Sequence, residues 1–164
     1  MKKLLSFVII LISIFISFTS CGGAASPKTF NESAMRIFEG ATKTLDNFDP
    51  KITAGVKSKD LASIAVAADA ALAEVDAQIE KMKALATPEN GEKYKESVLK
   101  SLESLKAIIE TGKKYSELKE GYTKSEFNAL EKEYNNKRKV LSDNLKEVAK
   151  TQADFAKAAG AKLR

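Results

Sequence analysis

Apolar residues recur at intervals of three and four along most of this chain, from about residue 30 to its end. This spacing places them on one face of an α-helix, and it is the heptad pattern of helices that pack side by side. Four such stretches follow one another, and none alternates between apolar and polar residues as a half-buried strand would. The pattern predicts an all-α protein, and the short connections favour an antiparallel, up-down-up-down four-helix bundle.

The first stretch carries the apolar stripe Ala34, Phe38, Ala41, Leu45 and Phe48. Asn31 or Ser33 is expected to cap its start. Asp49-Pro50 is expected to end or kink the helix, because a residue before proline is pushed out of helical geometry. Ile52 and Val56 keep the spacing, so a short continuation beyond the proline is the alternative.

The second stretch keeps its steps without a slip through Leu61, Ala65, Ala68, Leu72, Val75, Ile79, Met82 and Ala86. Ser58 or Asp60 is expected to cap it, and Thr87-Pro88 to stop it. Pro88 can then begin a third helix, predicted from about residue 89 to residue 118. The stripe of this third helix is Val98, Leu102, Leu105 and Ile109.

The fourth stretch is expected to start at Thr123 or Ser125, with Glu126 in the first turn, where the helix dipole favours a negative charge. Its stripe runs through Phe127, Leu130, Tyr134, Leu141, Leu145, Val148, Gln152 and Phe155, and Gly160 ends it. Gln152 is a polar residue in an apolar stripe and must find hydrogen-bond partners. It either sets the register of the bundle, which we prefer, or contacts a ligand.

Composition excludes several kinds of chemistry. The chain has no histidine, which the usual catalytic triads and the di-iron bundle site require. The acidic run 46–49 lacks the remaining ligands of a calcium loop, and an Asx turn at a helix end is expected there. Lys and Arg number 27 and Asp and Glu 22, in an interspersed order typical of a solvated surface rather than a nucleic-acid footprint. We expect no enzyme, no cofactor, no metal site and no nucleic-acid partner.

The first 21 residues follow a different pattern. Lys2 and Lys3 precede an almost wholly apolar run from Leu4 to Phe18, and Thr19-Ser20-Cys21 follows it. A basic start, an apolar run and small residues describe a secretory signal, and the run is short for a helix that crosses a bilayer. A transmembrane anchor with an incidental cysteine is the alternative.

This stretch resembles a bacterial lipoprotein signal with its lipobox, in which Thr19, Ser20 and Cys21 match the last three positions and Phe18 departs from the usual aliphatic residue. The resemblance implies cleavage between Ser20 and Cys21 and acylation of Cys21, for example with palmitate. Cys21 is the only cysteine, so no intramolecular disulfide can form in an oxidising compartment. Two or more acyl chains suffice for stable anchoring. The expected parts are a signal peptide (1–20), a lipidated cysteine with a flexible tether (21–29) and the bundle (30–164).

The rest of the chain is similar to a group of small bacterial surface lipoproteins that are expected to be helical bundles. The shared features are the lipobox, the proline before the third helix (Ala86-Thr87-Pro88-Glu89), Tyr134-Asn135 in the fourth helix, and the ending Gln152-Ala153-Asp154-Phe155-Ala156. The resemblance implies placement in the outer membrane or at the cell surface, and it implies no particular activity.

An up-down-up-down bundle would put the connections near residues 49–60 and 118–123 at the tip farthest from the membrane, roughly 40 Å from the base. The candidate contact for a protein partner at this tip is Lys113, Lys114, Tyr115, Lys119 and Tyr122. Solvated loops with aromatic residues closing the bundle end are the plainer alternative.

The sequence as a whole predicts a lipid-anchored cell-envelope protein whose non-catalytic bundle serves interaction or structure. The alternative function is a periplasmic or surface carrier or sensor that holds a small apolar molecule between its helices. If the helices pack loosely, such a molecule would lie near Gly112 and Gln152.

Overall fold

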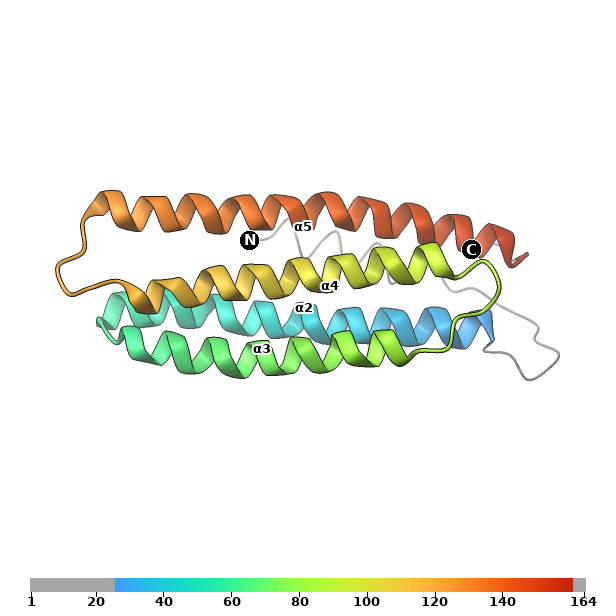
Figure 1. Cartoon of the computed structure of the whole chain (residues 1–164), viewed down its shortest axis with the longest axis horizontal. Helices are drawn as coiled ribbons and strands as arrows, with labels where there is room; N and C mark the ends of the chain where they lie inside the picture. The colour runs from blue at the N-terminus through green and yellow to red at the C-terminus, as the bar shows by residue number, and fades with distance from the viewer. Residues whose placement is uncertain (1–25, 161–164) are drawn as a thin grey trace.

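The computed structural model of the protein describes residues 26–160. Four long helices lie side by side as a helical bundle, and no strand occurs within this range (Figure 1). They are α2 (Pro27–Ser58), α3 (Leu61–Ala84), α4 (Glu92–Lys113) and α5 (Lys124–Ala158), with the short 3-10 helix η1 (Lys114–Glu117) after α4. The all-α prediction is confirmed for these residues, whereas the expected signal peptide and Cys21 lie outside them.

The start of α2 differs from the sequence prediction. The helix begins at Pro27, so the last residues of the expected tether are helical. Proline suits a first helical position because its missing N–H would have no partner there in any case. Neither Asn31 nor Ser33 caps the helix: Ser26 occupies the cap position, and Asn31 is buried. The earlier start has a packing reason, because it brings Phe30 into the core at 1% exposure.

α2 also continues through Pro50 to Ser58, so the helix does not end at Asp49-Pro50, and the alternative of a continuation beyond the proline is confirmed. A proline inside a helix costs about 3 kcal/mol or more. Phe48 and Ile52 are buried on either side of it, and their burial keeps the helix on the core. Asp46 and Pro50 are exposed, so the carbonyl of Asp46, which loses its N–H partner, lies on the side of the helix open to water. The run 46–49 is helical and forms no Asx turn.

The connection between α2 and α3 is short, and the start of α3 is capped as expected. Lys59 adopts the left-handed conformation at φ 60°, and the Asp60 side chain accepts a hydrogen bond from the Ser63 N–H at 3.2 Å. The predicted cap at Asp60 is therefore confirmed. It satisfies one of the backbone donors that a helix start leaves unpaired.

Pro88 does not begin the third helix, contrary to prediction. It is buried in the connection, where the Gly91 N–H donates to its carbonyl at 3.0 Å, and α4 starts only at Glu92. The Lys95 ammonium of α4 donates to the carbonyls of Lys83 and Leu85, at 2.9 and 2.6 Å. A cation at the carboxyl end of α3 complements its dipole. This contact fixes the end of α3 against the first turn of α4.

α4 ends at Lys113, earlier than the predicted residue 118, and tightens into η1. The chain then turns through Gly121, which has a φ of 82°. α5 opens with a reciprocal capping box, as Thr123 and Glu126 each accept a hydrogen bond from the other's backbone N–H. The predicted start at Thr123 is confirmed.

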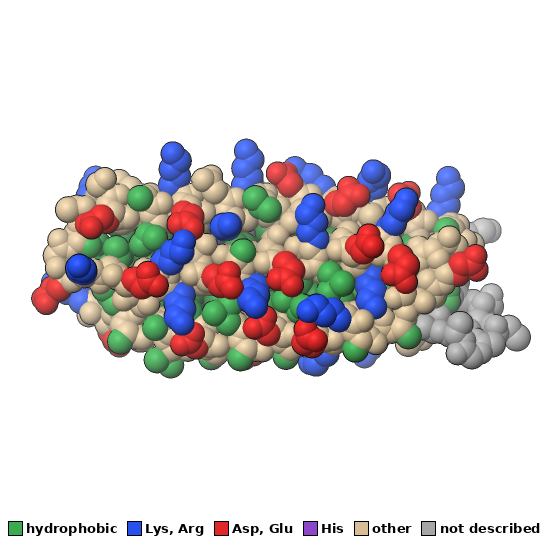
Figure 2. Space-filling view, in the orientation of Figure 1, with side chains coloured by type: hydrophobic (Ala, Val, Ile, Leu, Met, Phe, Trp, Pro, Cys, Tyr) green, Lys and Arg blue, Asp and Glu red, His purple; other side chains and the backbone are tan. Residues whose placement is uncertain are grey.

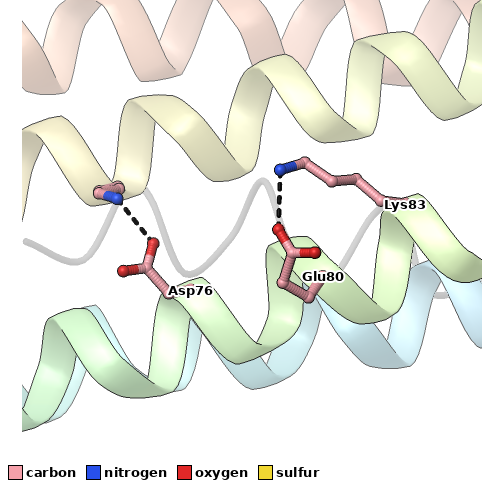
Figure 3. A network of polar contacts seen from close by, with 4 residues as sticks. Asp76, Glu80 and Lys83 are labelled. Carbon is pink, nitrogen blue, oxygen red and sulfur yellow. Dashed lines mark hydrogen bonds and ion pairs between the residues drawn. The ribbon is translucent and has the colours of Figure 1, made fainter.

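Charged contacts join α3 to α4 at heptad spacing. Lys106 pairs with Asp76 at 2.7 Å, and Lys113 pairs with Asp69 at 2.6 Å. The two lysines lie seven residues apart on α4, and their aspartate partners lie seven residues apart on α3 in the reverse order. Figure 3 shows Asp76 reaching across to the neighbouring helix, while Glu80 pairs with Lys83 of its own helix at 2.7 Å.

α2 and α4 approach each other closely at Gly112. A Cβ atom added at Gly112 would lie 2.6 Å from Phe48 Cε1 and 2.8 Å from Ile52 Cδ1. Glycine suits this helical position because a residue with a side chain would not allow the two helices to approach so closely. The space that the sequence left open for a ligand near Gly112 is filled by Phe48 and Ile52.

Candidate functional site

The lipidation site proposed from sequence, Ser20-Cys21, lies outside the described residues. Within residues 26–160, no helix is both long and apolar enough to span a bilayer. The proposed contact residues at the far end of the bundle are all described, as are three further places where polar groups enter the helix interfaces.

The predicted lysines of the tip are engaged within the bundle. Lys113 pairs with Asp69 of α3, and Lys114 pairs with Glu133 of α5 at 2.7 Å. Both pairs are partly exposed, and such pairs contribute little to stability, typically below about 1 kcal/mol. Lys119 is exposed on the connection that leads to α5. These three lysines thus belong to three different segments: α4, η1 and the connection before α5.

The predicted tyrosines, by contrast, come together. Tyr115 is 4% exposed and packs edge-to-face on Phe127 and Tyr134, with ring centroids 5.6 and 6.3 Å away. Tyr122 is half-buried and stacks on Phe127 at 6.1 Å. Burial, with a smaller contribution from the Glu131 carboxylate, raises the pKa of Tyr115 to about 12. These rings close the far end of the bundle, as in the plainer of the two sequence interpretations.

A second aromatic cluster closes the other end. Phe30 lies edge-to-face against Tyr94 and Phe155, with centroids 5.8 and 5.5 Å away, and Tyr94 stacks on Phe155 at 5.8 Å. The three rings come from α2, α4 and α5. Aromatic contacts of this kind add about 0.5–1.5 kcal/mol beyond burial.

Buried polar atoms lie beside this cluster. The Gln152 Nε2 donates to Asn31 Oδ1 at 2.8 Å, so the glutamine predicted to need a partner has one. The Tyr94 hydroxyl and Gln152 Oε1 have no hydrogen-bond partner of standard geometry among the described residues. Burial raises the pKa of Tyr94 above its ordinary range, and the nearby Gln152 side chain offsets part of this shift.

A half-buried ionic cluster joins α2 to α5. The Asp49 carboxylate accepts hydrogen bonds from the Tyr134 hydroxyl and the Arg138 guanidinium. Arg138 also lies over the Tyr134 ring, 5.2 Å from its centroid. Desolvation lowers the pKa of Arg138 and raises the pKa of Asp46, and the Coulombic attraction between these two groups opposes both shifts. Asp49, not Asp46, makes the direct contact with the guanidinium.

Small polar residues line the interface between α4 and α5. Ser97 and Thr151 share a hydrogen bond at 2.7 Å, and the Asn144 amide donates to the Ser104 hydroxyl at 2.7 Å. Neither these contacts nor the Asp49 cluster were predicted from the sequence. A signal for the former was present, because Ser97 and Ser104, like Asn144 and Thr151, are seven residues apart.

A groove of about 390 Å³ runs between α2 and α3 on the outside of the bundle, lined by Gly40, Lys43, Thr44, Asn47, Glu74, Ala77, Gln78 and Lys81. The Thr44 hydroxyl donates to Glu74 Oε2 at 2.8 Å across its floor. Six of its eight lining residues have polar or charged side chains, so it does not match the small apolar ligand of the alternative function.

Residues 26–160 bring together no group of three or more cysteine or carboxylate side chains that could hold a metal ion. In comparisons with known proteins, no family, no curated protein and no solved structure matches this chain. The function is therefore inferred from the residues themselves.

Proposed function

We propose that this chain is a lipid-anchored protein of the bacterial cell envelope, placed in the outer membrane or at the cell surface, whose helical bundle has a non-catalytic, interaction or structural role. The observation that carries the proposal is the sequence Leu4–Cys21, which combines an apolar run with a lipobox-like ending. Only five residues separate Cys21 from the first helical residue, Pro27. An acylated Cys21 would hold the start of α2 close to the lipid.

The proposal includes an antiparallel, up-down-up-down course of the helices. Contacts that support it include Phe30 against Phe155, which joins the start of α2 to the end of α5. Phe48 and Gly112 lie together in the later parts of α2 and α4. In this arrangement the Tyr94 end of the bundle is the end next to the anchor, and the Tyr115 end is the opposite one.

The alternative function, a carrier for a small apolar molecule, has weaker support. Phe48 and Ile52 occupy the space at Gly112, and the unsatisfied atoms beside the Tyr94 cluster are polar. A ligand there would need to offer a hydrogen bond to Gln152 Oε1, which an apolar molecule cannot do.

Mass spectrometry of the protein extracted in mild detergent from a bacterial envelope tests the proposal. We expect a chain that begins at Cys21 and carries at least two acyl chains, and a Cys21→Ser variant that remains unprocessed and unacylated. A chain that keeps residues 1–20, or that lacks acyl groups, would refute the anchor. A discrete small-molecule adduct under native conditions would favour the carrier.

A further inference from the structure

Five lysines form a row on the outward side of α5: Lys132, Lys139, Lys146, Lys150 and Lys157. All five are exposed. At about 100° per residue they fall within about 40° of one another around the helix axis and extend for about 38 Å along it. Figure 2 shows Lys and Arg side chains projecting at intervals from one long edge of the molecule, the edge that α5 forms in Figure 1.

Most of this charge is not neutralised within the bundle. Lys146 pairs with Asp143 at 2.7 Å, and both side chains are more than half exposed. The other four lysines have no carboxylate of residues 26–160 within ion-pair distance. An exposed ion pair is weak, so even Lys146 can exchange its partner.

The edge of the bundle opposite α5 has a net negative charge. Figure 1 places α3 and α5 at opposite edges. α5 carries eight Lys and Arg against six Asp and Glu, whereas α3 carries two against four. The outward side of α3 is mostly alanine, with Val66 at 72% exposure. An anionic surface would therefore attract the α5 edge and repel the α3 edge.

We propose that the lysine row on α5 docks the bundle lengthwise on an anionic lipid surface, so that the bundle lies along the membrane instead of standing on its base. This inference rests on the proposed lipid anchor. A planar surface can meet all five lysines at once, because they share one line. The exposed positions beside the row include Asn135, Asn136, Asp143, Glu147 and Asp154 and no aromatic residue, so the row lacks the stacking groups of single-stranded nucleic-acid sites.

The start of α2 and one end of the lysine row lie at the same end of the bundle. Phe30 packs on Phe155, so the start of α2 lies close to Lys157. The five residues between Cys21 and Pro27 extend over at most about 18 Å. An acylated Cys21 would hold Lys157 near the lipid headgroups. The resulting high effective concentration of headgroups would favour binding of the other four lysines.

Each lysine close to an anionic bilayer strengthens binding by about fivefold, so reversing three charges weakens docking by more than about 100-fold. Salt weakens it as well, because the screening length falls from about 10 Å at 0.1 M to about 3 Å at 1 M.

Tryptophan fluorescence on vesicles tests the proposal, because the chain has no tryptophan. The full chain, expressed in a bacterium that processes lipoprotein signals, is reconstituted into vesicles with brominated acyl chains, containing either phosphatidylglycerol or only phosphatidylcholine. Asn135→Trp places a reporter beside the row, and Ala73→Trp places one on the outward side of α3. We expect loss of emission for Asn135→Trp on phosphatidylglycerol vesicles only, and full emission for Ala73→Trp on both.

The control variants separate the row from general charge. Lys132→Glu, Lys139→Glu and Lys146→Glu together should restore the emission of Asn135→Trp. Reversing Lys81, Lys93 and Lys100, which are exposed on α3 and α4, should not. Circular dichroism verifies that both triple variants fold. Quenching that survives the first triple variant, or that is absent or equal on both vesicles, would overturn the proposal.

Flotation distinguishes failure of the docking from failure of the anchor. A chain that floats with vesicles at 1 M salt but keeps full emission refutes the docking alone. A chain that floats only at low salt with phosphatidylglycerol supports the docking and refutes the anchor, and a chain that never floats refutes both. The protein could also bind polyphosphate through the lysine row and show no quenching on vesicles. This result would assign the row to a free polyanion and overturn the membrane assignment.

Discussion

Asn31 and Gln152 meet through a hydrogen bond of 2.8 Å inside the bundle, although 121 residues separate them in the sequence. Gln152 is 0% exposed and Asn31 is 6% exposed. A shift of α5 by one turn against α2 would leave both amides buried without this partner, at a cost of about 1–3 kcal/mol for each. The pair therefore favours one register of the two helices, which is the role we preferred for Gln152 from the sequence.

Replacing one member of this pair should destabilise the bundle more than replacing both. Gln152→Leu or Asn31→Leu leaves a buried amide unsatisfied, and we expect a loss of about 1–3 kcal/mol in the free energy of unfolding. The double variant should recover most of this loss, since neither amide remains. Urea unfolding of the four proteins gives the coupling energy. Additive single effects would mean that the hydrogen bond contributes nothing to stability.

Gly112→Ala should destabilise the bundle although alanine is the better helix former. The new methyl group would meet the Phe48 ring and the Ile52 side chain, and such overpacking costs about 1–3 kcal/mol. The gain in helix propensity, about 1 kcal/mol, offsets only part of it. A lower midpoint of thermal unfolding is the expected result.

Gly40→Ala is the matched control for this effect. A Cβ atom at Gly40 would lie 3.1 Å from Gln78 Nε2, the end of a flexible side chain that can move away. We expect no loss of stability, or a small gain. Equal losses in the two variants would show that helix packing at Gly112 is not the cause.

Asp49→Asn should cost about 2 kcal/mol. Removing one partner of a fully buried ion pair costs about 3–5 kcal/mol, and the exposure of these side chains, 19% for Arg138 and 18% for Asp49, reduces this. The variant leaves the guanidinium desolvated with a weaker acceptor. Urea unfolding at neutral pH measures the loss.

Asp46→Asn, unlike Asp49→Asn, should not destabilise the protein at neutral pH. Partial desolvation of the Asp46 carboxyl beside Arg138 raises its pKa above the ordinary value of 3.8, so the folded state holds the proton more tightly than the unfolded state. The resulting stabilisation is complete below the unfolded pKa and is lost as pH rises through the folded pKa. At neutral pH the asparagine variant should be as stable as the parent or more stable. A clear loss there would mean that Asp46 is a second essential partner of Arg138.

Alkaline pH should unfold the protein through its buried phenols. Burial raises the pKa of Tyr94 and Tyr134 above their ordinary range, and raises that of Tyr115 to about 12. Their contribution to stability is complete below the unfolded pKa of 10.0 and is lost as pH rises through the folded values. We expect ultraviolet absorbance of these phenolates to appear together with the loss of helical circular dichroism. Ionisation of all three near pH 10 in a fully helical protein would contradict this.

Thr123→Ala should loosen the start of α5, because it removes one half of the capping box. A lost N-cap typically costs about 1 kcal/mol. Hydrogen bonds from Thr123 lower the pKa of Glu126, so this contribution is present above the unfolded pKa and disappears as pH falls through the folded pKa. Thr123→Ser keeps the cap and serves as control. Hydrogen exchange at the first turn of α5 should rise in the alanine variant alone.

The local features of the fold were predictable because their causes are local. Heptad spacing located the four helices, and the polar residues Asp60 and Thr123 marked two of their starts. Two of the errors occurred at prolines. Pro50 lies within a helix because Phe48 and Ile52 are buried on both sides of it, and Pro88 lies four residues before one. A proline's local preference is a few kcal/mol, and burial of neighbouring side chains can exceed it.

The sequence by itself determined the helical segments, their apolar faces, the absence of histidine and the signal-like start, because each can be read along a few turns of chain. The tertiary structure alone decided which polar groups meet: Asn31 with Gln152, Asp49 with Arg138, and Lys113 with Asp69. It also left the lysine row of α5 facing outward, with an ion pair only between Lys146 and Asp143 among the described residues. Helical periodicity is a local property, whereas these pairings depend on how helices far apart in the sequence turn toward one another when their apolar faces are buried.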